Sequence, residues 1–131
     1  MTGDLVVGLG CRSGVRAADV RATVAALLAR HGLDPAAVRA YATLDERAGE
    51  SGLRALAGPA LLAYPARLLA LVDVPNPSAR VAAAVGTAGV AEAAALHGAA
   101  ELAPPGASVA LVAPKLAGTG VTAAAARIGP G

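Results

Sequence analysis

The chain of 131 residues contains neither phenylalanine nor tryptophan, and its only aromatic side chains are Tyr41 and Tyr64. Proteins that stack nucleobases need several exposed rings, so this composition does not favour binding of single-stranded nucleic acid. The 11 basic and 9 acidic residues give a formal net charge of +2, and the arginines are scattered along the chain. A clustered basic surface for nucleic acid is therefore not expected.

Cysteine and long apolar runs are also scarce. The single cysteine, Cys11, cannot form an internal disulfide, and one cysteine with two distant histidines does not make a zinc site. No uncharged run reaches the roughly 18 residues that span a bilayer. Asp4 and the lack of a basic start argue against a secretory signal. We expect a cytoplasmic protein with no metal or cofactor of its own, no nucleic-acid partner and no membrane association.

Short apolar segments alternate with segments of helical periodicity. Strands are expected at residues 5–9, 38–44 and 60–64, with helices at 20–31 and 53–57 and another after Pro65. Residues 108–113 and 121–128 predict a final hairpin. The pattern indicates one α/β domain over residues 1–131, with its core at about 5–128. It should have three layers and a mixed, mostly parallel sheet with a C-terminal antiparallel hairpin.

Two helix starts lie close together in residues 74–92. Asn76 can cap a helix that ends at Gly86, and Gly89 can open a second one. Neighbouring helix N-termini present unpaired N–H groups that suit anions. We therefore expect Asn76, Ser78, Gly86, Thr87 and Gly89 to bind a substrate.

The second of these helices is expected to run from Gly89 to Gly98. Glu92 stands at its third position, where a carboxylate can reach back to the start of the helix.

A glycine-rich loop follows the first predicted strand. Gly8, Gly10 and Gly14 resemble a nucleotide fingerprint only in part, because Asp45 lies 31 residues beyond Gly14 and the fingerprint expects a carboxylate about 20 residues on. Gly10 and Gly14, with Arg12 as a charged clamp, can instead hold carboxylates. A tight turn with a solvated arginine is the alternative.

Cys11 lies in the same loop, just before a helix. A helix N-terminus can lower the pKa of a thiol and make it a nucleophile. A small buried structural cysteine is the alternative.

Three further polar side chains are expected at the carboxyl edge of the sheet, where ligands of α/β proteins bind. Thr43 and Asp45 can activate water as catalytic residues, or they fill a strand position and cap a turn. Lys115, at the end of a strand, can meet an acidic substrate or protect an edge strand.

Six segments carry a family resemblance: Gly8–Arg12, Thr43–Asp45, Gly52–Leu53, Val74–Ser78, Gly86–Glu92 and Val112–Lys115. In order and spacing they resemble the cobalamin-biosynthesis family made of CobE and the C-terminal domain of CbiG. The resemblance covers about residues 5–128. The chain departs from the family pattern at Val15 and Gly89, where members tend to have Thr or Ser, and at Ala117, where a second basic residue often stands.

The resemblance implies that the chain binds a precorrin or corrinoid intermediate as a carrier or accessory domain. CbiG as a whole is similar to a hydrolase that opens the ring lactone of cobalt-precorrin-5A and releases acetaldehyde, so a hydrolase is one alternative. An interaction module that completes a separate CbiG-like partner is another. Other cobalamin-pathway proteins are possible partners, and cobalt enters only if the ligand carries it.

Overall fold

The computed structural model describes residues 3–56, 58–74 and 89–130. Its strands are β1 (Leu5–Cys11), β2 (Val38–Leu44), β3 (Ala60–Tyr64), β4 (Ser108–Ala117) and β5 (Val121–Gly129). Its helices are α1 (Ala17–Arg30), α2 (Ser51–Arg54), α3 (Ala66–Leu69) and α5 (Val90–Leu102), with short 3₁₀ turns at η1 (Pro35–Ala37) and η2 (Asp45–Arg47).

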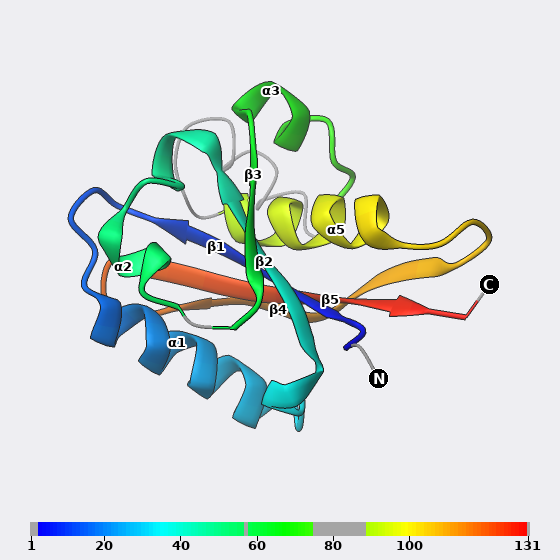
Figure 1. Cartoon of the computed structure of the whole chain (residues 1–131), viewed down its shortest axis with the longest axis horizontal. Coiled ribbons are helices and arrows are strands. Elements are labelled where there is room, and N and C mark those ends of the chain that lie inside the picture. Colours follow the sequence, from blue (N-terminus) through cyan, green and yellow to red (C-terminus); the bar gives the residue numbers. More distant parts are fainter. Residues whose placement is uncertain (1–2, 57, 75–88, 131) are drawn as a thin grey trace.

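The strands form one sheet in the order β3-β2-β1-β5-β4. β1, β2 and β3 are parallel to one another, and β5 runs antiparallel to both β1 and β4. Helices α1 and α5 lie on opposite sides of this sheet (Figure 1). The predicted α/β fold, with a mostly parallel sheet and a C-terminal antiparallel hairpin, is confirmed.

Each face of the sheet has its own core. On the α1 side, Val20, Val24 and Leu27 pack in a cluster with Leu5, Val7 and Leu9 of β1. On the α5 side, Val6 and Ala42 pack with a set of small residues from the helix, namely Ala93, Ala94, Ala95 and Ala99. Because both faces are covered, all seven residues of β1 are buried, which explains its continuous apolar sequence.

Two glycines set the close approach of α5 to the sheet. A Cβ atom at Gly8 would lie 1.9 Å from the carbonyl oxygen of Ala91. A Cβ at Gly98 would lie 3.1 Å from Cγ1 of Val6. The prediction that the helix ends at Gly98 is therefore wrong. This glycine lies inside α5, which continues to Leu102, and it faces the sheet at a point where an added Cβ would push neighbouring side chains aside by a few tenths of an ångström.

The hairpin is longer than the sequence predicted. β4 was expected to end at residue 113 but reaches Ala117, passing through Pro114. β4 is an edge strand, and its register with β5 shifts between Ala113 and Leu116. Edge strands and bulges are the places where a sheet tolerates proline. Lys115 therefore lies within a strand and not after its end.

The other predicted boundaries differ less. The strands at 38–44 and 60–64 are confirmed, whereas β1 continues past residue 9 to Cys11. The short helix expected at 53–57 is Ser51–Arg54. The helix expected at 76–85 lies outside the described residues. None of the described helices is long and apolar enough to cross a membrane.

Because Gly8 lies against the backbone of Ala91, we expect a methyl group added at Gly8 to lower the stability of the fold strongly. Gly8→Ala should lower the free energy of unfolding by about 3 kcal/mol, the upper end of typical overpacking costs, because backbone atoms must move apart. Gly49→Ala is the matched control, since nothing lies within 4 Å of its added Cβ. Urea unfolding of both variants measures the difference, and equal stabilities would contradict the proposed packing constraint.

Candidate functional site

The loop between β1 and α1 is held by a carboxylate of the chain itself. Gly14 adopts a φ of +80°, and its N–H donates to Oε1 of Glu50 at 2.8 Å. The Ser13 hydroxyl donates to Oε2 of the same side chain at 3.5 Å. The Gly14 N–H, which we expected to receive a substrate anion, is thus engaged by an internal carboxylate in this structure.

The segment after β2 is tied to the end of β1 at a second point. Nε of Arg47 donates to the carbonyl oxygen of Cys11 at 2.9 Å. Cys11 itself is fully buried. Burial raises the pKa of its thiol, the nearby Glu50 carboxylate raises it further, and Arg47 opposes both. The geometry therefore favours a protonated structural thiol over a nucleophile.

Two hollows meet along α1. One, of about 190 Å³, lies at the start of the helix and includes Arg12, Gly14 and Arg16 in its lining. The other, of about 320 Å³, is bordered by α1 and by the end of β4. Asp19 and Thr119 line both. We call the combined feature the α1 groove; its remaining lining residues are Ser13, Val15, Ala22, Thr23, Ala26, Leu116, Ala117, Gly118 and Gly120.

The α1 groove is cationic at one end and mostly apolar at the other. Arg12 and Arg16 are exposed, and neither forms an ion pair with any side chain of the described ranges. Ala22, Ala26 and Leu116 line the other end. An anionic ligand with a large apolar body could place a carboxylate on the arginines. Among the residues that the structure describes, Asp19 is the one carboxylate that lines the groove.

Thr43 and Asp45 occupy different environments. Thr43 is fully buried, and its hydroxyl donates to the carbonyl oxygen of Leu9 at 2.7 Å. Asp45 is exposed in the first position of η2, where no side chain caps the turn. The hydroxyl of Thr43 therefore connects β2 to β1. Thr43 and Asp45 do not form a shared catalytic site.

Lys115 is connected to the opposite layer from Arg12. Its backbone N–H donates to Oε2 of Glu92 at 3.0 Å, which links β4 to α5. We expected Glu92 to reach back to the start of its own helix, but it bonds across to the strand. Glu92 is 1% exposed, and its Oε1 has no hydrogen-bond partner in the part of the chain that the structure describes.

Sequence reasoning did not identify Glu92 or Glu50 as site residues. A carboxylate in the first turn of α5, flanked by alanines, was the available signal for Glu92, because a carboxylate is seldom buried without a specific reason. Glu50 gave no such signal, since only the folded chain brings it to Gly14.

The remaining expected site residues lie in several places. Gly10 is within β1, where its carbonyl oxygen accepts from the Thr122 hydroxyl at 3.4 Å. Gly89 is buried and directly precedes α5. The other four lie outside the described residues: Asn76, Ser78, Gly86 and Thr87. Among the described side chains, no group of three or more His, Cys, Asp or Glu could hold a metal ion.

The environment of Cys11 predicts low thiol reactivity. Because burial raises its pKa, the thiolate is depleted at neutral pH, and the fold also blocks access. Native protein should react with a disulfide reagent such as DTNB at least about 100-fold more slowly than protein in guanidinium chloride, a ratio that reflects transient opening of a buried site. Absorbance at the reagent's product band follows both rates. Fast labelling of the native state would restore the nucleophile hypothesis.

Comparisons with known proteins agree with one another. The family described as "Cobalamin synthesis G C-terminus" matches residues 5–126. CobE, a protein from the cobalamin (vitamin B12) biosynthetic pathway, superposes with a TM-score of 0.76 at 30% identity, covering 94% of this chain and 92% of that one. The cobalamin biosynthesis protein ChiG from Agrobacterium tumefaciens strain C58 gives a TM-score of 0.67 at 30% identity, covering 94% and 97%. No curated protein sequence matches.

The family match spans most of the chain, and the two solved structures are alike over nearly their whole lengths. The chain therefore belongs to the cobalamin synthesis G C-terminus family and takes part in cobalamin biosynthesis.

Proposed function

We propose that this chain binds a precorrin or corrinoid intermediate along the α1 groove and acts as a carrier or accessory domain. A corrinoid intermediate is a large apolar macrocycle with several carboxylates at its periphery. The α1 groove offers the complementary features, with alanine and leucine side chains along its length and two arginines at one end. Ligand sites of this kind combine apolar walls with a few placed polar groups.

The unpaired arginines are the observation that carries this proposal. Arg12 and Arg16 belong to the loop and the helix cap on either side of Gly14. Both guanidinium groups can form bidentate bonds with carboxylates. An acidic macrocycle that rests against Leu116 could thereby be oriented by its peripheral carboxylates.

Binding is better supported than hydrolysis by the arrangement of the polar side chains. The Thr43 hydroxyl is buried and donates to Leu9, so it is not placed to activate water. The hydrolase alternative would then depend on the exposed Asp45. Acetaldehyde released from a lactone-bearing precursor, and lost in Asp45→Ala, would favour that alternative.

The first experiment is a titration of the purified chain with hydrogenobyrinic acid, followed through the visible absorbance of the corrinoid. We expect a saturable spectral shift. Arg12→Gln and Arg16→Gln should each weaken binding about threefold to tenfold, as expected for a solvent-exposed ion pair or a charge-assisted hydrogen bond.

Arg21→Gln is the matched control, because Arg21 is an exposed arginine of α1 that does not line the groove. Its affinity should equal that of the wild type. Equal weakening in all three variants would mean that only the net charge matters, and unchanged affinity in both groove variants would overturn the site.

The Glu50 carboxylate gives a second prediction of opposite sign. It bonds to Gly14 and Ser13 beside the arginines, so it repels an incoming carboxylate and competes for the same N–H group. Glu50→Gln should therefore tighten hydrogenobyrinic acid binding about threefold to tenfold, the effect of removing a nearby like charge. Glu46→Gln is an exposed control, and weaker binding in Glu50→Gln would show that the bond to Gly14 preorganises the site.

A further inference from the structure

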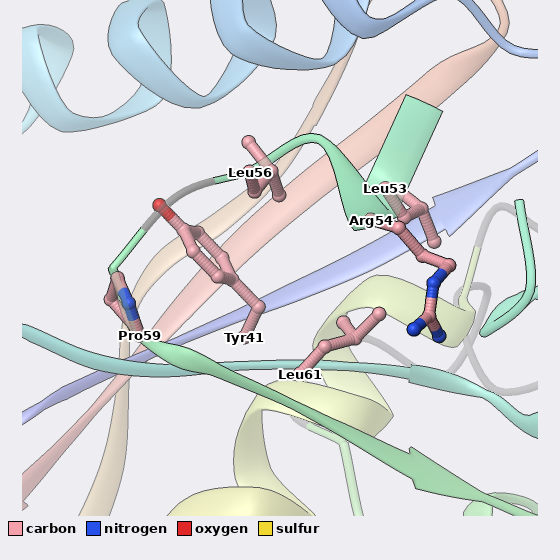
Figure 2. A pocket seen from close by; sticks show the side chains of 6 residues that line it. All are labelled: Tyr41, Leu53, Arg54, Leu56, Pro59 and Leu61. Atoms are coloured by element: carbon pink, nitrogen blue, oxygen red, sulfur yellow. The ribbon is translucent and has the colours of Figure 1, made fainter. Parts of the chain in front are cut away.

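A separate hollow lies over β2 and β3 on the α1 side of the sheet (Figure 2). On that side α1 packs against β4 and β5, so α2 and the residues after it cover the other half. The hollow that remains has a volume of about 270 Å³, and its lining residues are Tyr41, Leu53, Arg54, Leu56, Pro59 and Leu61.

Four of the six residues that line this hollow are apolar, although polar atoms make up the larger part of its exposed surface. Tyr41 and Leu61 are register partners on the parallel strands β2 and β3, which places their side chains on the same face of the sheet. Leu53 is 1% exposed and belongs to the same core cluster as Tyr41. These packed residues give the hollow a fixed apolar wall.

Two polar groups stand at its opposite sides. Figure 2 shows the Tyr41 ring beside Leu56 and Pro59, with Arg54 on the other side and Leu61 between them. The Tyr41 side chain is 9% exposed, and its hydroxyl makes no hydrogen bond with any described residue. The hydroxyl is not one of the fully buried polar atoms that lack a partner, so it reaches solvent at the edge of the hollow and is available to a ligand. Burial raises the pKa of Tyr41, so the phenol stays a donor at neutral pH.

Arg54 supplies a charge that nothing in the hollow balances. Its guanidinium forms no ion pair within the described ranges, and no Asp or Glu lines the hollow. A ligand that meets all of these groups needs an anionic end for Arg54, an apolar body for the leucines, and an acceptor for Tyr41.

We propose that this hollow binds a small carboxylate whose apolar body separates the charge from a second hydrogen-bond acceptor, as in a medium-length keto acid. Its volume is at or below the lower end of ligand pockets, which suits a small ligand. The hollow shares no lining residue with the α1 groove, and the proposal does not depend on the proposed function.

The test is a methyl NMR titration of the full chain with sodium hexanoate and sodium 5-oxohexanoate. Saturable shifts of the Leu53, Leu56 and Leu61 methyl groups are expected with both probes. Acetate, which has a charge but no apolar body, should cause none at the same concentrations. Shifts confined to the α1 groove, or no saturable shift with either probe, would overturn the proposal.

Two substitutions assign the polar contacts. Arg54→Gln should weaken hexanoate binding about threefold to tenfold, as for an exposed charge-assisted contact, and the exposed Arg67, which lies on α3, serves as the control in Arg67→Gln. We expect 5-oxohexanoate to bind more tightly than hexanoate, because its keto oxygen can accept a hydrogen bond from the Tyr41 hydroxyl. Tyr41→Phe should remove this difference in affinity. An unchanged preference in Tyr41→Phe, or unchanged affinity in Arg54→Gln, would contradict the assignment.

Discussion

The close contact between α5 and β1 is the constraint on which the rest of the fold depends. The backbone of the helix at Ala91 lies directly against Gly8 in the central strand, where no space for a side chain remains. The chain has no Phe or Trp to fill a wider gap, so the two layers approach until small residues touch. Short distances then supply dispersion contacts that large side chains would otherwise provide.

The close contact between α5 and β1 also places the Glu92 carboxylate of α5 near the strands. With the helix close to the sheet, Glu92 reaches the backbone of Lys115 and joins α5 to the bent edge strand. The opposite face is organised differently, because Glu50 and Arg47 tie the segment after β2 to the loop after β1. The two faces of the sheet thus differ. The α5 side carries the hydrogen bond between Glu92 and the Lys115 N–H, and the α1 side carries the α1 groove and the small hollow over β2 and β3.

The polar residues near the carboxyl edge illustrate why a sequence pattern does not assign chemistry. Thr43 follows the alternation of its strand as expected, but its hydroxyl is satisfied by Leu9 on the neighbouring strand. Cys11 was expected in a loop just before a helix, but it is the last residue of β1, α1 begins only at Ala17, and burial raises the pKa of the thiol. Arg12 and Lys115 were expected at the same edge of the sheet, yet Arg12 follows β1, Lys115 lies in β4 with β5 between the two strands, and their contacts belong to opposite layers. In each case the partner comes from a distant part of the chain.

The sequence by itself determined the α/β class, the strands at 38–44 and 60–64, the C-terminal hairpin and the family, because periodicity and motif spacing are local properties of the chain. It did not determine where α5 ends, how long β4 is, or which group accepts the hydrogen bond from the Gly14 N–H. Nor did it determine the position of the α1 groove or of the hollow over β2 and β3. Those depend on packing between segments far apart in sequence, where one absent Cβ or one distant carboxylate decides the geometry. Tertiary structure alone sets these contacts, since no local pattern encodes which surfaces meet.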